Sequence, residues 1–313
     1  MTRTTSPGTN EKGYSTEIMK KEGLCLHRLT LPAPAPGFTD FITPWLLHTK
    51  QATLLVDPGP SATIPDLVEV LKDQGVDEID FVLLTHIHID HAGGIGDFLS
   101  AFPNARVVSH PRSFRHLVDP GKLWAGSLQV LGDLANQYGP IEAVPEKALL
   151  ESAGGFVPGF GVIHTPGHSS HHQSYLYTYG DTKILFAGEA AGVYLGENYL
   201  RPATPPRFFF DVAYESLQKL IAVEPTLICY GHFGHTHDTG WLRNAAEQMQ
   251  LWRRVLQDLL MRDVETAQAL SVLEQQDRYL TRRHRFDGQI ASRERYFIEN
   301  SIKGFLQSLS EGT

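Results

Sequence analysis

Four residues that can bind a metal ion lie within six consecutive positions, directly after the apolar run at residues 81–84. They are His86, His88, Asp90 and His91. Because side chains two residues apart on an extended backbone point the same way, His86 and His88 can present both imidazoles to one ion. Asp90 and His91 follow where the chain turns, and they face a second point. The spacing predicts a cluster of two metal ions roughly 3.5–4 Å apart, as in hydrolytic binuclear sites.

The alternative interpretation of this segment is a surface loop that is rich in histidine. Such a loop rarely follows a strand of apolar and β-branched residues, and it rarely ends in Ala-Gly-Gly as residues 92–94 do here. The context therefore favours a metal site.

Three further segments carry residues of types that could complete such a site. Residues 165–169 read Thr-Pro-Gly-His-Ser, residues 229–234 read Cys-Tyr-Gly-His-Phe-Gly after a short apolar strand, and residues 56–59 read Val-Asp-Pro-Gly. Together with the H-x-H-x-D-H run, these segments resemble the ordered motifs of the metallo-β-lactamase-fold superfamily. The resemblance spans about residues 24–237, and four motifs in the right order are more specific than any one alone.

The resemblance implies a ligand set for two ions. It places three histidines on the first ion, namely His86, His88 and His168. It places three ligands on the second ion, namely Asp90, His91 and His232. In this family the aspartate of the first motif, here Asp57, supports the ligands and the backbone without touching metal.

The chain departs from the family at the carboxylate that bridges the two ions. This residue is usually Asp, whereas the matching segment 184–189 ends here in Glu189. Glutamate offers the same two oxygens, but a different rotamer or a shifted backbone must absorb its extra methylene. We expect Glu189 to be a bridging or single-metal ligand. The alternative is that Glu189 contacts only a metal-bound water or a neighbouring side chain.

Fifteen histidines are present, and they cannot all be ligands. His171 and His172 lie just past the 165–169 segment and are predicted to support the site or the backbone. His235 and His237 follow His232 closely and are candidates for the pocket rim. A loop histidine near a metal is more often a hydrogen-bond partner than a ligand, which favours that role for both.

Composition limits the cellular setting that we expect. The 313-residue chain has only two cysteines, Cys25 and Cys229, in apolar strand-like runs, so we predict reduced, buried thiols and no disulfide. The first 22 residues lack the apolar core of a signal peptide, and no run of about 18 apolar residues could span a bilayer. We therefore expect a cytoplasmic protein without a membrane partner, which counts against a secreted antibiotic-degrading β-lactamase.

Charge limits the class of substrate. The net charge is −8, from 35 acidic and 27 basic residues, whereas enzymes that act on nucleic acids usually carry a positive surface. The short basic cluster at residues 282–285 is more often a solvated helix face. We expect a small-molecule substrate and no nucleic-acid partner. A homodimer is one option for the oligomeric state.

Strand-like runs alternate with helical patterns in an α/β order. We predict strands at 24–31, 44–49, 53–56, 81–85, 106–109, 161–164, 173–178, 183–187 and 227–230, and helices at 64–74, 95–101 and 214–223. The family resemblance implies a four-layer αββα metallo-β-lactamase sandwich, with two mixed sheets face to face, helices outside and the metals at one sheet edge.

This interpretation divides the chain into three parts. Residues 1–22 are predicted to be a flexible N-terminal segment, 23–240 the αββα domain, and 241–313 a helical C-terminal extension packed on it. Helical patterns at 241–261, 266–273 and 294–309 carry apolar stripes that we interpret as packing surface. Such an extension resembles the one that glyoxalase II-type thioesterases place over the active site, although no binding motif of theirs is identifiable.

Three further features are expected near the pocket. Residues 111–150 read as helices that could wall it. Residues 199–211 contain three prolines and three consecutive phenylalanines between the Glu189 and His232 motifs, so we predict a pocket-lining loop rather than a mere connection. Tyr194 is predicted to reach the cluster and polarise a carbonyl oxygen, as a tyrosine does in the superfamily's lactonases. The alternative is a packed tyrosine.

The chemistry that these residues favour is metal-assisted hydrolysis of a carbonyl substrate such as a thioester or lactone. The resemblance implies attack by a metal-bound hydroxide on a polarised carbonyl, with Asp90 and Tyr194 as catalytic residues. Two divalent ions are expected, with zinc preferred and iron, manganese or nickel as alternatives, because sites built from histidine and carboxylate accept all four. The histidines must be neutral to bind metal, so activity should fall in acid.

Two other functions remain open. An iron-dependent oxidoreductase, similar to the superfamily's persulfide dioxygenases, would hold a single iron on this site. A non-catalytic metal-binding protein would keep the fold without turnover. Intact histidine ligands argue against the second possibility.

Overall fold

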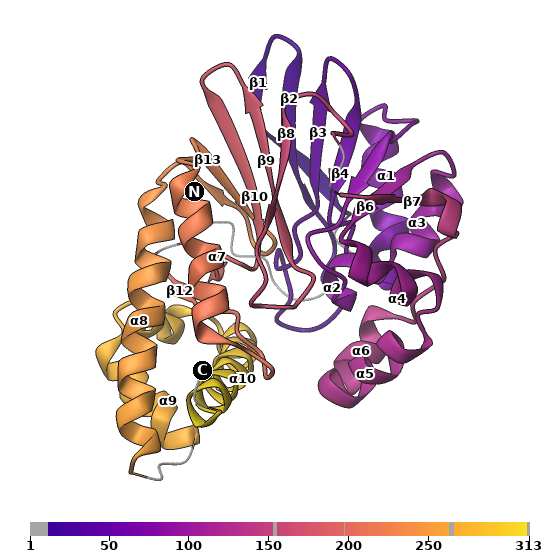
Figure 1. Cartoon of the computed structure of the whole chain (residues 1–313). Helices are drawn as coiled ribbons and strands as arrows, with labels where there is room; N and C mark the ends of the chain where they lie inside the picture. Colours follow the sequence, from indigo (N-terminus) through magenta and orange to yellow (C-terminus); the bar gives the residue numbers. More distant parts are fainter. Residues whose placement is uncertain (1–11, 153–154, 197, 263–265, 312–313) are drawn as a thin grey trace.

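Two β-sheets face each other in the middle of the molecule, and helices cover both outer faces (Figure 1). The computed structural model describes residues 12–152, 155–196, 198–262 and 266–311. The layer order is helix, sheet, sheet, helix, which confirms the predicted αββα fold class with C-terminal helices.

The first sheet has seven strands in chain order. They are β1 (Tyr14–Lys21), β2 (Leu24–Thr30), β3 (Trp45–Thr49), β4 (Thr53–Val56), β5 (Phe81–Leu83), β6 (Arg106–Ser109) and β7 (Leu149–Glu151). Strands β1 to β4 pair antiparallel, and β4 to β7 pair parallel. The parallel strands end at one edge of the sheet, so the loops after them can meet there.

The second sheet has five strands, and a small hairpin lies beside it. In spatial order the strands are β14 (His235–Thr236), β13 (Leu227–Tyr230), β10 (Thr182–Gly188), β9 (Gln173–Tyr179) and β8 (Phe160–His164). Strands β10 and β13 pair parallel, while the other pairs are antiparallel. The hairpin consists of β11 (Val193–Tyr194) and β12 (Leu200–Arg201).

The helices belong to three groups. The first group covers the seven-stranded sheet and comprises α1 (Ile64–Asp73), α2 (Ile89–Ala92) and α3 (Ile95–Ala101). The second is α4 (Phe114–Val118), α5 (Gly121–Leu131) and α6 (Asp133–Tyr138). The third covers the five-stranded sheet and comprises α7 (Phe210–Ala222), α8 (Gly240–Leu260), α9 (Thr266–Gln276) and α10 (Gly288–Ser310). Within the described residues, no helix is long and apolar enough to cross a membrane.

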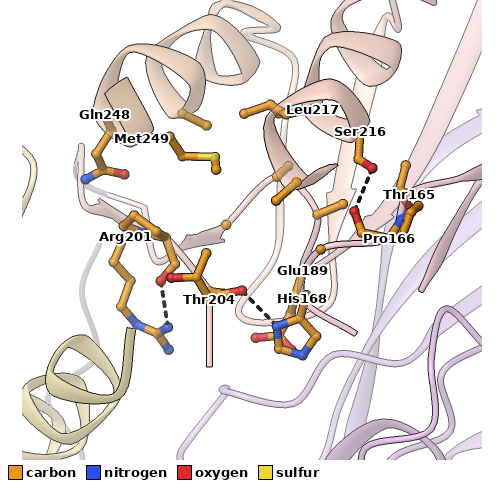
Figure 2. A pocket seen from close by; sticks show the side chains of 18 residues that line it. Thr165, Pro166, His168, Glu189, Arg201, Thr204, Ser216, Leu217, Gln248 and Met249 are labelled. Carbon is orange, nitrogen blue, oxygen red and sulfur yellow. Dashed lines mark hydrogen bonds and ion pairs between the residues drawn. The ribbon is translucent and has the colours of Figure 1, made fainter. Parts of the chain in front are cut away.

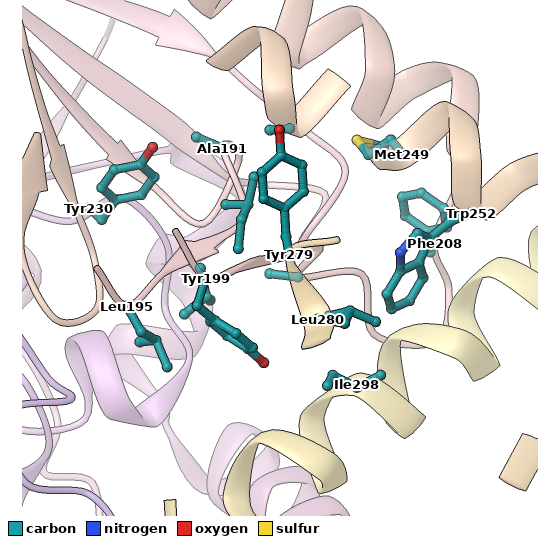
Figure 3. Packing of buried hydrophobic residues seen from close by; sticks show 14 of the residues in the cluster. Ala191, Leu195, Tyr199, Phe208, Tyr230, Met249, Trp252, Tyr279, Leu280 and Ile298 are labelled. Atoms are coloured by element: carbon teal, nitrogen blue, oxygen red, sulfur yellow. The ribbon is translucent and has the colours of Figure 1, made fainter. Parts of the chain in front are cut away.

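Alternating side chains of the strands fill the three spaces between the four layers. In β4, Leu54 and Val56 join the core between the sheets, whereas Leu55 packs with α1 and α3. In β10, Phe186 joins the core between the sheets and Leu185 packs toward the C-terminal helices. Successive side chains of a strand point to opposite faces, so a strand that lies between two layers must be apolar on both faces. Figure 3 shows the third core, where Tyr230 of β13 and Trp252 of α8 belong to one apolar cluster.

The predicted strands and helices are confirmed to within a few residues, the short strands β11, β12 and β14 were not predicted, and two predicted segments differ from the structure. The segment 1–22 was predicted to be flexible, but Tyr14–Lys21 form β1 along the edge of the first sheet. The reason is nonlocal, because β1 gains its ladder from β2 and places Ile18 and Met19 against the core between the sheets. Residues 1–11 lie outside the described residues. The second difference is that the helical segment 111–150 ends in strand β7, which pairs with β6.

A buried ionic network joins the C-terminal helices to the rest of the fold. Glu294 of α10 is 0% exposed and accepts hydrogen bonds from Arg201 Nε at 2.6 Å, Tyr199 Oη at 2.8 Å and Arg293 Nε at 2.8 Å. The two guanidinium groups lower the pKa of this carboxyl although burial alone would raise it. A single carboxylate thus compensates two buried cations.

Glu294→Gln should lower the free energy of unfolding by about 3–5 kcal/mol, because it leaves Arg201 and Arg293 buried without a counter-charge. Urea unfolding followed by circular dichroism measures this loss. The matched control on the same helix is Glu299→Gln, which breaks the solvent-exposed pair with Arg295 and should cost no more than about 0.5 kcal/mol. Equal effects of the two substitutions would contradict the network's role.

Candidate metal centre

The seven predicted ligands come together where loops leave the ends of the two sheets. His86 and His88 follow β5, Asp90 and His91 lie on the short helix α2, and His168 follows β8. The last two ligands follow β10 and β13, and they are Glu189 and His232. The sequence motifs therefore placed all seven side chains at one site.

The first group of donor atoms is formed by three histidines and Glu189. His88 Nδ1 lies 3.1 Å from His86 Nε2 and 2.8 Å from His168 Nε2. Glu189 Oε2 lies 2.7 Å from His168 Nε2 and 3.5 Å from His86 Nε2. These four side chains offer donor atoms within 4.8 Å of one another. Such a set can surround one cation.

The second group is formed by Asp90, His91 and His232, again within 4.8 Å of one another. The two Nε2 atoms of this group are 3.3 Å apart, and His232 Nε2 lies 3.7 Å from Asp90 Oδ2. Glu189 reaches this group as well, with Oε1 3.4 Å from His232 Nε2 and Oε2 3.7 Å from His91 Nε2. Glu189 therefore stands between the two groups.

Hydrogen bonds fix the orientation of four imidazoles so that each turns Nε2 toward the centre. Their Nδ1 atoms lie within hydrogen-bond distance of oxygens at 2.9–3.2 Å, in the pairs His86 with Thr85 Oγ1, His91 with Asp57 Oδ2, His168 with the carbonyl of Ala203, and His232 with the carbonyl of Phe41. A neutral imidazole that donates from Nδ1 carries a lone pair on Nε2. Lone pairs that converge at these distances repel one another unless a cation lies between them, so the donor set fits metal ions.

Asp57 supports the site from below, as the sequence motif predicted. Its carboxylate accepts hydrogen bonds from the backbone N–H and the hydroxyl of Thr85, at 2.8 and 2.6 Å, and from His91 Nδ1 at 3.0 Å. The residue is 3% exposed and has a backbone φ of 49°. It therefore joins the end of β5 to a ligand of the second group.

His171 and His172 hold backbone segments rather than facing the donor groups, in line with the prediction. His172 Nε2 accepts the backbone N–H of Glu189 at 3.1 Å, and its Nδ1 bonds with Thr165 Oγ1 at 2.8 Å. His171 Nε2 accepts the backbone N–H of Ile87 at 3.2 Å. Burial lowers the pKa of both imidazoles, to about 3 for His171, so they stay neutral acceptors.

Two glycines make room for the ligands that follow them. A Cβ on Gly188 would lie 2.5 Å from His172 Nε2, and its φ of 57° is in the left-handed region. A Cβ on Gly231 would lie 2.7 Å from Cε1 of His91. Since ordinary contacts are about 3.5–4 Å, a side chain at either position would displace a histidine.

The buried charges of the centre are strongly coupled. Burial and neighbouring imidazoles lower the pKa of His86 well below its ordinary value and that of His88 to about 4. Burial also lowers the pKa of His91, but the carboxylates of Asp90 and Asp57 outweigh it and raise the value to about 9. For Glu189, burial opposes ionisation, but His168 and the other imidazoles lower the pKa well below its usual range. The Glu189 carboxylate is therefore ionised, and imidazoles of both groups surround it.

A small cavity of about 20 Å³ borders the first group. Its wall includes His168 and Glu189, and Met249 and Leu217 face them across the space (Figure 2). The segment 199–211 lines the cavity through residues 201–204, as predicted. Its phenylalanines serve a different role, because Phe208 and Phe210 pack on Phe305 of α10.

Two aromatic features of the site carried no sequence signal. Phe41 stacks on His232 with ring centroids 4.0 Å apart. The guanidinium of Arg293 lies 4.0 Å from the centre of the same Phe41 ring. Tyr138 of α6 is 1% exposed, and its hydroxyl has no hydrogen-bond partner among the described residues. Both come from segments without a motif, so only the fold could reveal them.

Tyr138 and Tyr194 differ in the charges and side chains that surround them. Burial raises the pKa of Tyr138 well above its ordinary value, and the charges of Asp90 and Glu189 raise it further. The ring of Tyr194 packs on Tyr230 and Trp241, and burial and the charge of Asp238 raise its pKa. These contacts of Tyr194 match the packed alternative, and its catalytic role stays a prediction.

Comparison with known proteins gives one consistent result. The family model of the metallo-beta-lactamase superfamily matches residues 38–232. A metallo-beta-lactamase fold-containing protein of Sulfurisphaera tokodaii is 29% identical over 214 residues, which are 66% of this chain and 77% of that protein. A hydroxyacylglutathione hydrolase of Aeromonas salmonicida is 32% identical over 202 residues, and the match covers 63% of each chain, which is less than two thirds of that relative.

The fold has close counterparts among solved structures. The crystal structure of an archaeal metallo-beta-lactamase superfamily protein from Sulfolobus tokodaii has a TM-score of 0.63 and 24% identity. The similarity covers 92% of this chain and 98% of that one, so it includes the C-terminal helices.

The neutral state of His171 makes the metal-free protein sensitive to acid. The folded pKa is about 3, whereas the unfolded chain takes up a proton near the ordinary value of 6.5. Stability is therefore lost as pH falls from 6.5 toward 3, by about 1.4 kcal/mol per pH unit from this residue. Urea unfolding of chelator-treated protein at a series of pH values should show a shallower dependence for His171→Gln. An unchanged slope would contradict this role of His171.

Proposed function

Because the chain belongs to the metallo-β-lactamase superfamily, we propose that it is a binuclear metallo-hydrolase acting on a thioester or a lactone. The observation that carries the proposal is the convergence of two donor groups on Glu189, with the imidazole tautomers fixed by their Nδ1 partners. The five histidines and two carboxylates include no thiolate, and zinc is the proposed metal for this donor set.

The proposed ligands are His86, His88, His168 and Glu189 for one ion, and Asp90, His91, His232 and Glu189 for the other. When bound, the two ions supply hydroxide near neutral pH and act as Lewis acids toward the substrate carbonyl. The residues supply orientation and charge. The carboxylates of Asp90 and Glu189 offset the positive charge of the ions, and the neutral imidazoles stay in place through their buried Nδ1 hydrogen bonds.

Asp90 is the proposed proton carrier. Its side chain is 17% exposed, compared with 9% for Glu189 and 2% for His232. The carboxylate therefore lies at the open side of the centre, where it can accept a proton from the attacking water and return it to the leaving group.

The substrate class rests on two observations. The hydroxyacylglutathione hydrolases that resemble this chain are named for the hydrolysis of an acylated thiol. The cavity beside His168 is lined largely by small apolar side chains, such as Ala191, Ala213 and Ala245, which suit an acyl chain better than a charged group. We propose a small-molecule thioester as the first choice and a lactone as the second.

Glu189 also bears on the oxidoreductase alternative. A dioxygenase site holds one iron with open positions, whereas the Glu189 oxygens lie within 3.7 Å of ligands of both groups. This position favours two ions and hydrolysis. From composition alone, we further propose a cytoplasmic protein that has no nucleic-acid or membrane partner.

Protein purified without added metal should contain at least two zinc ions per chain, two of them in this centre, and hydrolyse members of a panel of acyl thioesters and lactones in preference to phosphodiesters. Glu189→Gln should lose the second ion before the first and lower kcat at least about 100-fold, because the charge that offsets the two cations is gone. Elemental analysis and a thiol-release assay measure both effects.

Glu299→Gln, which breaks only the pair with Arg295 on α10, is the matched control and should keep both metals of the centre and full turnover. The wild-type metal content with full turnover in Glu189→Gln would contradict a ligand role for Glu189. One iron per chain, with oxygen consumption on a persulfide substrate, would replace the hydrolase by the dioxygenase.

Tyr138 and Tyr194 can be tested against each other as the residue that polarises the substrate. An unpartnered buried hydroxyl is costly, and we propose that a substrate oxygen is the partner of Tyr138. We expect Tyr138→Phe to lower kcat about tenfold, equivalent to one hydrogen bond of about 1.4 kcal/mol, with two metals retained. If Tyr194→Phe lowered kcat more than Tyr138→Phe, Tyr194 would be the residue that polarises the substrate.

A further inference from the structure

A second group of metal-binding side chains lies on strands β1 and β2, outside the centre described above. It consists of Glu17, Cys25 and His27, whose donor atoms lie within 4.8 Å of one another. None of the three belongs to the loops after β5, β8, β10 and β13. Figure 1 shows β1 and β2 at the top of the sheet, whereas α2, which carries Asp90 and His91, lies toward its lower end.

Strand geometry brings the three side chains to one face. Cys25 and His27 are two residues apart on β2, and Glu17 of β1 is paired directly with His27. The register of β1 shifts between Glu17 and Met19, so that Met19 joins the core between the sheets while Glu17 stays beside His27. A β-bulge that re-aims a side chain in this way is common beside functional sites.

The distances suit a tetrahedral ion. Cys25 Sγ lies 3.0 Å from His27 Nε2 and 3.8 Å from Glu17 Oε2. Metal bonds of about 2.0–2.3 Å at tetrahedral angles put neighbouring donor atoms about 3.3–3.8 Å apart. The two distances from Cys25 Sγ lie close to this range, and the three donor atoms lie within 4.8 Å of one another, so side-chain adjustments can bring them onto one ion with a water in the fourth position.

His27 is already oriented as a ligand. Its Nδ1 lies 2.9 Å from Ser15 Oγ, so the N–H on this side is satisfied and the Nε2 lone pair faces Cys25. A metal-binding histidine characteristically donates its other N–H to such a partner. Burial lowers the pKa of this imidazole. His48 packs edge-on against His27, but its Nδ1 lies within hydrogen-bond distance of Thr53 and leaves Nε2 of His27 free to bind a metal.

A weak ion pair at Glu17 and the thiol proton of Cys25 compete with metal binding. Lys20 Nζ lies 3.7 Å from Glu17 Oε2, but 71% and 48% of these side chains are exposed, so the pair contributes little. Burial raises the pKa of the Cys25 thiol, and Glu17 raises it further, so the free protein holds the S–H form. On binding, the sulfur–metal bond forms as the thiol proton leaves to solvent.

We propose that Glu17, Cys25 and His27 form a third metal site, separate from the binuclear centre, that takes zinc or another borderline divalent cation. The ion would join the edge strand β1 to β2 through side chains, in addition to the backbone ladder. The site therefore stabilises an edge strand that has only one neighbour in its sheet.

Cobalt(II) tests the proposal, because a thiolate bound to cobalt gives a strong charge-transfer absorption in the near ultraviolet. The proposed binuclear centre has no thiolate, and the only other cysteine, Cys229, is 1% exposed in the core between the sheets. Titration of the metal-free full chain with cobalt should therefore produce this absorption in the wild type and in Cys229→Ala, and none in Cys25→Ser. Elemental analysis should show one fewer ion per chain in Cys25→Ser.

Two further measurements make the result decisive. Ser15→Ala should keep the absorption but weaken the cobalt affinity of this site about tenfold, because His27 loses its orienting partner. Cys25→Ser should leave hydrolysis unchanged, so loss of the binuclear centre and loss of this site are distinguishable. An absent thiolate band in the wild type, or a band that persists in Cys25→Ser, would overturn the proposal.

Discussion

The hydrogen bond at Nδ1 of four of the five inward-facing imidazoles is the interaction on which the centre depends. It fixes the tautomer and the ring plane, so that Nε2 of His91 and His168 can only face the other donors. The acceptors are held just as firmly, because Asp57 is buried at the end of β4 and the carbonyl of Ala203 belongs to the segment pinned by Arg201. The two rigid sheets thereby fix the orientation of four imidazole rings, whereas His88 turns its own Nδ1 toward the other donors.

The three apolar cores explain why the loops can carry so many charged and polar groups. Each sheet buries one face against the other sheet and the second face under helices, so the strand ends are fixed before the loops contribute anything. Glu189 can then be ionised deep in the protein because the strand geometry leaves it surrounded by imidazoles. Burial alone would have kept such a carboxyl neutral.

Local sequence patterns predicted the metal-binding residues that lie in short motifs. They missed the residues and strands whose role depends on contacts with parts of the chain that are distant in sequence. His86, His168 and His232 sit in short motifs at strand ends, so spacing and order were enough to bring them together. Strand β1 has no such pattern and depends on its ladder with β2, as the bulge at Glu17 shows. Glu294 was missed for the same reason, because Tyr199 and Arg201 lie far from it in the chain. Tyr138 was missed because no motif surrounds it.

The Glu294 network sets an order of events during synthesis. Every proposed ligand has been made once residue 232 leaves the ribosome, yet the carboxylate that neutralises Arg201 arrives only with α10, some sixty residues later. Until then the nascent chain must keep Arg201 hydrated, and the wall of the cavity beside His168 cannot close. The metal-binding loops can therefore be complete while the site is still open, and a chain that stops short of α10 would leave the ribosome with its cavity unsealed.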